Sequence, residues 1–556
     1  MRKTVCGKTG FGAKLVYFLL AAVAVPSVEA VTVSSVTELQ TAIANATTGA
    51  EIVIAASGSP YDLSTADCMS RAGHLYAANQ IILRGSTGNP SDVVLVGSTN
   101  RILYCLKSGN VIRDLTFKNG NCTKNIITSE VPEETCTGGA ICLRVNHDET
   151  SVSNCIFTGN TAVNGGAVAN YYAAKSTRWA GSFEDCIFTN NTSTSDGGAA
   201  AVIKTLRRCV FLDNRAEEHG GALYCCELSE NCAFTNNNAT SDGGAIYCTD
   251  EYRIGRDAKT TGSLFSANTA NRCGGGACNC TLIGCTLIGN GAQYGGGADR
   301  CTLSFCTNTA NWKTATTVNC GTELYRCAAK VCVFDRVGCG GSTVFLASSL
   351  DSCRITLTNG FLVGSSNSGI TNCLIESGSN FYWFYNPGAT GPSLVNCTVV
   401  SNRYLGFKVG KEALQGAEIV NCFFYGNSFA DNKLYDINSS APEVVREFRN
   451  CLFKVQDGNS DYAPGSGNYD YYSVVDFKPG FVGAAKDPEN PYAITRKSPA
   501  FHENSAKYGV AGDAAIWSAT DTDFRGDGFL RLRDGKVDIG CYQCWLNPNG
   551  MVFSFR

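Results

Sequence analysis

Two short segments near the C-terminal end of the sequence have residue types and spacing that could bind a metal ion or carry redox chemistry. The sequence Asp521-Thr-Asp523-Phe-Arg-Gly-Asp527-Gly528 spaces its carboxylates like a small Ca²⁺ loop, but it lacks the distal bidentate Glu of such loops. Cys541 and Cys544 have the spacing of a redox pair without the βαβ context of thioredoxin-like proteins. We expect a structural turn and a structural cysteine pair, and Ca²⁺ binding is the alternative for the first segment.

Acidic residues and histidines that could cleave a glycan are spread along the chain. Lyases of the pectate-lyase type need clustered carboxylates with Ca²⁺ and a basic residue, and glycosidases need two close carboxylates. Single acids lie in turns, and the histidines are far apart: Asp196, Asp213, Asp242, His74, His147, His219 and His502. The sequence therefore identifies no catalytic residues, no metal ligands and no cofactor. Three or more acids and a basic residue converging in one lateral groove would favour an enzyme, and a smooth lateral face would favour a binding protein.

An aromatic run, Phe381-Tyr382-Trp383-Phe384-Tyr385, has the composition of a sugar-binding surface. In a strand, alternate side chains point to opposite faces, so one set would enter the core and the other would lie on the surface. Flat exposed rings can stack on sugar rings. We therefore predict a ligand-binding aromatic platform at Tyr382, Trp383, Phe384 and Tyr385, with core packing as the alternative.

A repeated structural unit must position these residues. One sequence pattern recurs through the first half of the chain. It contains a Cys, an apolar pair ending in Phe or Leu, an Asn, and then Gly-Gly-Ala. Successive copies begin at Cys155, Cys186, Cys209, Cys232, Ser263 and Cys285. Beyond them the cysteine register continues in Asn-Cys dipeptides that end at Cys373, Cys397, Cys422 and Cys451. Cys278 and Cys280 with Cys285 could bind zinc, although membership in the repeat already explains one of them.

A unit of about 22 residues with strands of three to five residues cannot bury its own apolar face, whereas stacked copies can. We predict an all-β fold, a right-handed single-stranded parallel β-helix of about 15 to 18 coils. Equivalent residues of successive coils would then form columns. We expect an interior stack of Phe157, Phe188 and Phe211, a column of free thiols, and an Asn ladder at a turn. Gly-Gly would supply a turn with positive φ.

Both ends of the solenoid have features of caps. Ser35-Val-Thr-Glu38 is a capping box that opens a short amphipathic helix, with Leu39 and Ile43 on its apolar face. We assign a cap and the first coils to residues 31–80, the β-helix to residues 81–455 and a distinct C-terminal segment to residues 456–556.

The first thirty residues predict export. A basic stretch precedes the apolar segment 15–25, and Val28-Glu29-Ala30 fits a signal-peptidase site. We predict a signal peptide at residues 1–30 and a mature chain that starts at Val31 and has no transmembrane segment. The net charge of −3 argues against a nucleic-acid partner, since such proteins carry a basic face.

The alternating Phe-x-x-Asn and Gly-Gly-Ala elements of residues 138–300 resemble the repeats of the chlamydial polymorphic outer membrane proteins. That resemblance implies an adhesive protein that is secreted or associated with the outer membrane. The chain departs from that family because it ends without the several-hundred-residue β-barrel segment typical of it, which puts autotransport in doubt. Ser498-Pro-Ala500, Thr522-Asp-Phe-Arg-Gly526 and Val537-Asp-Ile-Gly-Cys-Tyr542 resemble the terminal segment of exported bacterial β-helix repeat proteins.

These features favour a secreted or cell-surface, non-enzymatic protein that acts as an adhesin-like or carbohydrate-binding scaffold. Glycans or other polymers of a host or cell surface are the expected partners. A polysaccharide lyase or glycoside hydrolase of the pectate-lyase-like fold is the alternative.

Overall fold

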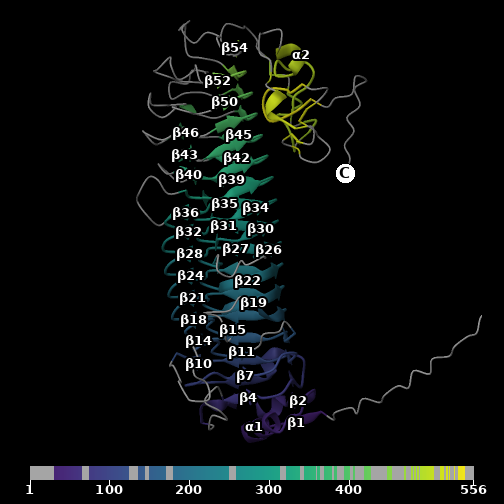
Figure 1. Cartoon of the computed structure of the whole chain (residues 1–556), viewed down its shortest axis with the longest axis vertical. Coiled ribbons are helices and arrows are strands. Elements are labelled where there is room, and N and C mark those ends of the chain that lie inside the picture. Colours follow the sequence, from purple (N-terminus) through teal and green to yellow (C-terminus); the bar gives the residue numbers. More distant parts are fainter. Residues whose placement is uncertain are drawn as a thin grey trace, which may run out of the picture.

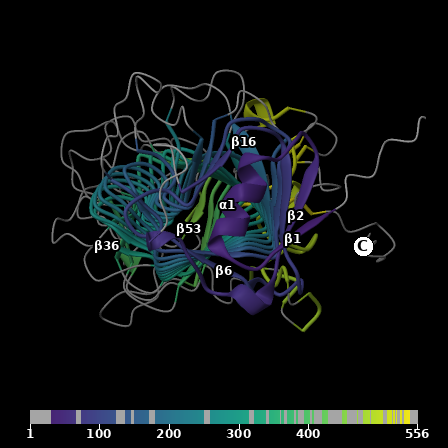
Figure 2. The ribbon, with the colours of Figure 1, turned by 90° about the horizontal axis from the view of Figure 1, so that it is seen from below.

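The chain winds into a long right-handed parallel β-helix (Figure 1), in which the strands of successive coils superpose when the solenoid is viewed along its axis (Figure 2). The computed structural model describes residues 30–65, 74–123, 136–144, 149–170, 179–249, 258–313, 321–337, 343–357, 360–363, 368–377, 381–384, 393–400, 405–406, 419–426, 448–453, 469–470, 478–479, 481–483, 485–487, 489–505, 512, 514–518, 521–523, 525, 531–532 and 536–544.

Three parallel sheets form the walls of the solenoid. Sheet A receives up to two strands from each coil and runs from β1 (Val31–Val33) to β52 (Phe448–Arg449). In a regular coil, β19 (Ala200–Arg207) of sheet A leads into sheet B and then sheet D, and β22 (Leu223–Glu230) starts the next coil directly above β19. Sheet B contains 17 strands among the described residues, and so confirms the expected range of coils.

The strands of sheet B are β3 (Tyr61–Asp62), β6 (Val94–Val96), β9 (Thr116–Lys118), β13 (Ile156–Thr158), β17 (Ile187–Thr189), β20 (Val210–Leu212), β23 (Ala233–Thr235), β27 (Leu264–Ser266), β31 (Thr286–Ile288), β35 (Thr307–Thr309), β39 (Val333–Val337), β42 (Arg354–Leu357), β45 (Leu374–Ser377), β48 (Thr398–Val400), β51 (Phe423–Tyr425), β53 (Leu452–Phe453) and β54 (Tyr469–Asp470).

The strands of sheet D are β10 (Asn121–Cys122), β14 (Thr161–Ala162), β18 (Thr192–Ser193), β21 (Arg215–Ala216), β24 (Asn238–Ala239), β28 (Thr269–Ala270), β32 (Gly291–Ala292) and β36 (Trp312–Lys313).

The corner between sheets A and B explains the Asn-Cys dipeptides. The residue before each column cysteine adopts a left-handed conformation, as at Asn154 (φ 48°), Asn372 (φ 58°) and Asn450 (φ 53°). Asn tolerates this conformation better than most residues, because its short polar side chain can bond locally. The dipeptide therefore marks a chain reversal in each coil.

The predicted aromatic stack is confirmed. Six Phe rings from successive sheet B strands stack at 4.7–5.2 Å between centroids, and all are fully buried: Phe117, Phe157, Phe188, Phe211, Phe234 and Phe265. The column continues with Leu287, Asn308 and Phe334. In-register parallel strands bring these residues together, since each lies above its counterpart in the coil below.

The predicted Asn ladder is also confirmed. Each side-chain Nδ2 donates to the Oδ1 of the next rung at 2.9–3.0 Å, and the backbone N–H donates to the same oxygen. The rungs are Asn160, Asn191, Asn214, Asn237, Asn268, Asn290 and Asn311. Each bond satisfies buried polar groups, which would cost free energy if they had no hydrogen-bond partner. The ladder ends where Nδ2 of Asn311 donates to the buried carboxylate of Glu323 at 2.6 Å.

The Gly-Gly turns lie in the expected place, but the register of the last two copies is different from the prediction. The positive φ falls on Gly274 (65°) and Gly295 (60°), not on the second glycine of each triplet. Gly276 aligns with Ala245, because the amide of Ala245 donates to the carbonyl of Gly276. Three consecutive glycines allowed either alignment in the sequence, and the pairing of Ile246 with Ala277 decides it.

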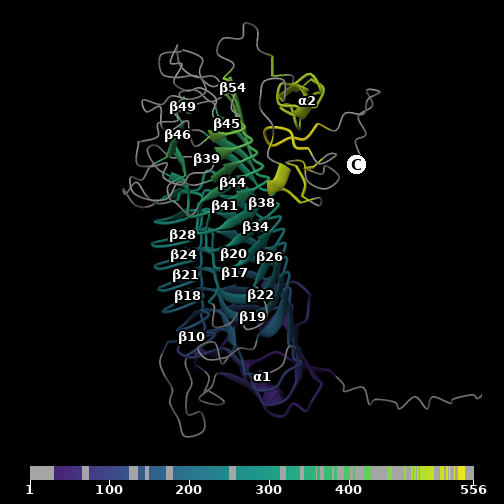
Figure 3. The same ribbon diagram turned by 45° about the horizontal axis from the view of Figure 1, so that its top comes forward.

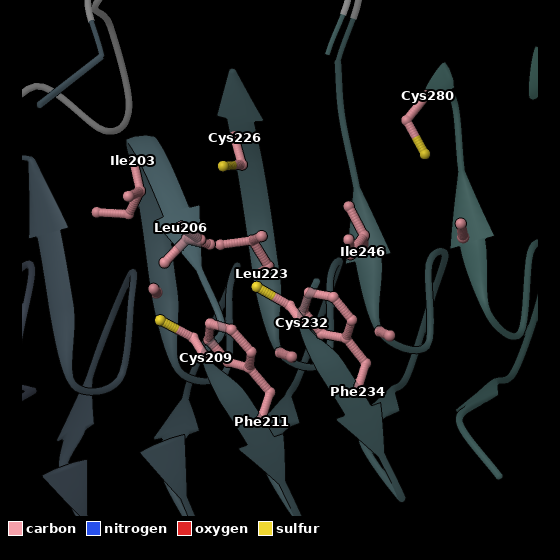
Figure 4. Packing of buried hydrophobic residues seen from close by; sticks show 14 of the residues in the cluster. Ile203, Leu206, Cys209, Phe211, Leu223, Cys226, Cys232, Phe234, Ile246 and Cys280 are labelled. Carbon is pink, nitrogen blue, oxygen red and sulfur yellow. The ribbon is translucent and has the colours of Figure 1, made fainter. Parts of the chain in front are cut away.

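The cysteine column forms an interior row beside the Phe stack (Figure 4). Its members are all buried: Cys155, Cys186, Cys209, Cys232, Cys285, Cys306, Cys332, Cys353, Cys373, Cys397, Cys422 and Cys451. Each Sγ donates to the carbonyl oxygen two residues earlier, at distances from 3.1 Å (Cys373) to 3.5 Å (Cys285). Ser263 takes the same place in its coil and donates in the same way at 2.9 Å.

The predicted N-terminal helix is present as α1 (Val36–Ala44), which covers the first coil (Figure 1). The hydroxyl of Ser35 accepts from the backbone N–H of Glu38, and the Glu38 carboxylate accepts in return from the backbone N–H of Ser34 at 2.7 Å. Leu39 and Ile43 are buried against the end of the solenoid. The cap hides the apolar interior of the first coil, as repeat proteins require.

The C-terminal segment lies alongside the last coils, outside sheet B (Figures 1 and 3). It contains α2 (His502–Ser505) and buries Phe501 and Tyr542 against Leu374 and Phe423 of the coils. Among the described residues, no helix is long and apolar enough to cross a membrane. The predicted signal peptide lies outside the described residues except for Ala30.

Candidate functional site

The predicted aromatic platform lies on β46 (Phe381–Phe384), a sheet A strand that pairs with β43 (Gly360–Val363). The side chains of Tyr382, Trp383 and Phe384 lie outside the part of the chain whose side chains the structure describes, and Tyr385 lies outside it altogether. The platform therefore stays a prediction.

The two C-terminal segments with possible metal or redox chemistry have internal contacts. The buried carboxylate of Asp523 accepts from the guanidinium of Arg525 at 3.0 Å and from the backbone N–H of Gln543 at 2.8 Å. Cys541 and Cys544 are both buried, and burial raises the pKa of the Cys541 thiol. These contacts tie the segment together, and a buried thiol of raised pKa is a poor nucleophile.

A polar cluster lies on the lateral surface where each turn after sheet D enters sheet A. Asp196, Glu218, His219, Asp242 and Arg272 come from the turns at the Gly pairs. Tyr247 lies on β25 (Ile246–Tyr247), Asp299 on β33 (Ala298–Asp299), and Tyr325 on β37 (Leu324–Tyr325). Arg300 and Arg326 follow those strands. These ten residues form the lateral cluster: Asp196, Glu218, His219, Asp242, Tyr247, Arg272, Asp299, Arg300, Tyr325 and Arg326.

His219 joins three coils at one end of the lateral cluster. Its Nδ1 lies 2.9 Å from Oδ1 of Asp196, and its Nε2 lies 3.9 Å from Oδ2 of Asp242. Its ring packs on Tyr247 with 4.5 Å between centroids. Burial alone would lower the pKa of His219, but the hydrogen bond and charge of Asp196 and the charge of Asp242 raise it. The two carboxylates therefore favour the protonated form of the His219 imidazole.

Asp242 is fully buried beneath this histidine. Arg272 binds both of its carboxylate oxygens, and the backbone N–H of Cys273 donates to Oδ1 at 3.1 Å. Burial would raise the pKa of Asp242, but Arg272, together with His219 and Arg300, holds it below its ordinary value. A buried carboxylate needs such partners, because an unpaired charge is costly to remove from water.

At the other end of the lateral cluster, the partly exposed side chains are arginines and the acid lies beneath them. Asp299 is fully buried, and it accepts from Arg300 at 2.9 Å and Arg326 at 3.0 Å. Burial raises the pKa of Asp299 in spite of both arginines. The Arg326 guanidinium lies over the Tyr325 ring at 4.1 Å. The side chains of Arg272, Arg300 and Arg326 remain 58%, 38% and 39% exposed, so guanidinium groups cover the carboxylates.

The sequence prediction that these acids and histidines are scattered is wrong for Asp196, Asp242 and His219. Parallel stacking brings them together, since all three occupy the position before the first glycine of a turn. That shared position was the available signal. Asp213 lies elsewhere, at the turn after β20, where Asn236 donates to it. His74 and His502 lie near the two ends of the solenoid, and His147 lies outside the described residues.

Comparisons with known proteins give two similarities. A family model of the Chlamydia polymorphic membrane protein repeat matches residues 185–202 and 231–249. Among solved structures, the PL6 family alginate lyase AlyGC is similar to this chain with 10% identity and a TM-score of 0.19, over 76% of this chain and 89% of that chain. No curated protein matches the sequence. The matched repeats contain the Cys, Phe, Asn and Gly positions of two coils of the parallel β-helix.

Proposed function

We propose that this exported β-helix repeat protein binds anionic polysaccharides along the lateral cluster. The observation that carries the proposal is the row of three partly exposed arginines, Arg272, Arg300 and Arg326, above buried carboxylates. The carboxylates fix the guanidinium groups without reaching the surface. Arg presents planar donors that match carboxylate and sulfate groups, and neighbouring Tyr rings offer flat surfaces for sugars.

The geometry supports binding better than it supports a carboxylate pair for hydrolysis. Four acids, one histidine and three arginines do meet on one lateral face, which is the kind of convergence expected of an enzyme. Asp242 and Asp299, however, are fully buried and their oxygens are taken by arginines. A glycosidase needs two carboxyl groups that reach the scissile bond. At the basic end of the lateral cluster, the outer surface instead presents the positive charge of Arg300 and Arg326 to an extended polymer.

Binding can be tested with polygalacturonate and alginate as anionic polymers and dextran as a neutral polymer of similar size. We expect binding of the two anionic polymers, weakened by added salt, because salt screens exposed charges. Arg326→Ala should weaken binding about tenfold, the size of one lost charge-assisted contact. In this variant Arg300 still pairs with Asp299.

Arg208→Ala is the matched control. Arg208 is 51% exposed and ion-paired with Asp185, but it lies at the corner between sheets A and B. Its loss should leave polysaccharide binding unchanged. Equal losses in both variants, or equal binding of dextran, would show that the lateral cluster is not the binding surface.

A second candidate function is polysaccharide cleavage, which the Asp196–His219 pair at 2.9 Å favours. A histidine held by a carboxylate can move a proton during elimination or hydrolysis. Tyr247 beside it keeps its proton, since burial raises its pKa to about 12. New reducing ends or unsaturated sugar products from the same polymers, lost in His219→Gln, would identify an enzyme. Binding without products would leave the protein a binder.

Export belongs to the same proposal and has its own test. The basic and apolar leader and the site at Val28-Glu29-Ala30 support cleavage after Ala30. Intact-mass analysis of the protein from its native host should show a chain that starts at Val31. A full-length intracellular species would contradict export.

A further inference from the structure

The acidic end of the lateral cluster holds three side chains with metal-ligand chemistry. One carboxylate oxygen each of Asp196 and Glu218 and one ring nitrogen of His219 lie within 4.8 Å of one another. The residues come from turns of two adjacent coils. The hydroxyl of Ser195 lies 3.3 Å from Oε2 of Glu218 and 3.4 Å from Oδ2 of Asp196, and so links the two carboxylates. An ion with ligand bonds of about 2 Å would draw these three atoms closer together.

Asp242 places a second carboxylate on the side of the His219 ring that faces away from Asp196. Histidine ligands usually donate their second ring N–H to a carboxylate, which fixes the tautomer and the ring orientation. If Nδ1 of His219 binds an ion, its proton lies on Nε2, which faces Oδ2 of Asp242 at 3.9 Å. Asp242 is fully buried and held in place by Arg272. Tyr247 packs on the ring and limits its rotation.

We propose that Asp196, Glu218 and His219 bind a Zn²⁺ ion. One imidazole nitrogen with two carboxylates is a donor set that Zn²⁺ accepts, whereas Ca²⁺ and Mg²⁺ prefer oxygen ligands alone. Three protein ligands leave a coordination position open, as in zinc sites that bind a further ligand. The side chain of Asp196 is 16% exposed and that of His219 is 25% exposed, so the open position faces the surface.

The bound ion would place positive charge next to the row of Arg272, Arg300 and Arg326. Without it, this end of the lateral cluster carries the carboxylates of Asp196 and Glu218, which would repel an anionic polymer. The ion would therefore neutralise these two carboxylates and remove the repulsion at this end of the solenoid. The zinc site itself stands on Asp196, Glu218, His219 and Asp242 alone, and its test contains no polysaccharide, so failure of either proposal leaves the other standing.

The test is titration of the purified mature chain with Zn²⁺ against a chromophoric chelator. We expect one site per chain whose affinity falls at least about tenfold in His219→Ala and in Glu218→Gln, because both remove a direct ligand. Glu217→Gln is the matched control, since this neighbouring acid is not one of the three ligands. Its Zn²⁺ affinity should equal that of the unaltered chain.

Two further measurements keep the outcome interpretable. Circular dichroism of each variant reports whether the fold survives, and Glu218, an exposed side chain, carries the test if His219→Ala fails to fold. The spectrum of the Co²⁺-loaded chain should lack thiolate charge-transfer bands, which excludes the cysteines as ligands. Equal Zn²⁺ affinity in all variants, a thiolate spectrum, or no stoichiometric Zn²⁺ binding would overturn the proposal.

Discussion

The coils from Cys155 to Asn311 and the coils from Glu323 to Phe453 share one solenoid but are stabilised in different ways. The first group contains most of the Phe stack and the whole Asn ladder, and its outward sheet B residues Ile187 and Val210 are 40% and 37% exposed. Among the described residues of the second group, the Asn ladder does not continue beyond Glu323, whereas the thiol column does. The equivalent outward residue Val333 is still 39% exposed at the start of this group, but Leu374 and Phe423 further along are buried under the C-terminal segment.

This difference shows that regular coils do not need an outer layer. Where stacked rings fill most positions of the interior column and bonded Asn amides fill the turns, each coil contributes its own stability and its contact with the next coil. Where those columns end, the chain adds an external layer that buries further apolar area. The predictions below test this contrast.

The largest expected effect follows truncation within the stack. Phe211 is fully buried and stacks on Phe188 and Phe234 at 4.7 and 4.9 Å. Phe211→Ala should lower the free energy of unfolding by about 3–5 kcal/mol. Phe334→Ala should cost about 1 kcal/mol less, because Phe334 has one edge-to-face partner, Phe345. Denaturant unfolding measures both.

Phe305→Ala is the control for these two variants, since this side chain is 66% exposed and should change stability little. A loss below about 1 kcal/mol for Phe211→Ala would mean that the stack does not hold the coils together.

The boundary between the two groups should respond to pH. Burial raises the pKa of Glu323 from 4.5 to about 8, although Asn311 donates to its carboxylate. The folded state therefore favours the protonated acid. The contribution of protonated Glu323 to the free energy of unfolding is fully present below pH 4.5 and is lost as the pH rises through about 8. We expect a loss on the order of a few kcal/mol across this range.

Glu323→Gln isolates this titration from that of the other acids. The variant keeps a neutral side chain at every pH, so the difference in stability between it and the unaltered chain should grow between pH 5 and 8. A constant difference would show that Glu323 ionises normally.

Two asparagines three residues apart should respond in opposite directions to the same change. Asn311 is the last rung of the ladder and bonds Asn290 and Glu323. Asn311→Leu should destabilise the fold by about 2–3 kcal/mol, because it leaves buried partners unpaired. Asn308 lies in the Phe column, and within the described residues neither Nδ2 nor Oδ1 has a hydrogen-bond partner. Asn308→Leu should therefore stabilise the fold by about 1–2 kcal/mol.

Thermal unfolding of the two variants side by side gives the sign of each change in stability directly. Two losses of similar size would mean that Asn308 is satisfied in solution and that the column tolerates a polar residue.

The smallest effect concerns the thiol column, the feature that both groups of coils share. Equivalent residues of neighbouring coils lie about 4.8 Å apart, whereas a disulfide needs Cβ atoms about 3.8 Å apart. We expect Cys186, Cys209, Cys373 and Cys397 to remain free. Labelling of the denatured, unreduced protein followed by peptide mapping should modify all four. Disulfide-linked peptides from adjacent coils would identify the column as a covalent staple.

The sequence by itself determined the columns and therefore the fold. Cys, Phe and Asn recur at fixed offsets within each unit, and stacking is the arrangement that buries all of them. The capping box before α1 was readable for the same reason, because helix caps depend on residues three positions apart. These are local patterns, and each coil repeats them.

Only the tertiary structure decided the lateral cluster and the alignment of the glycine triplets. Asp196, His219 and Asp242 occupy the same position of successive coils, 23 residues apart, but outward positions change residue type from coil to coil, so no recurring residue type marks them. Asp299 joins them across coils of different length. Interior positions are constrained by packing in every coil, whereas surface positions are not, and the chemistry of a surface site therefore depends on which residues stacking places side by side.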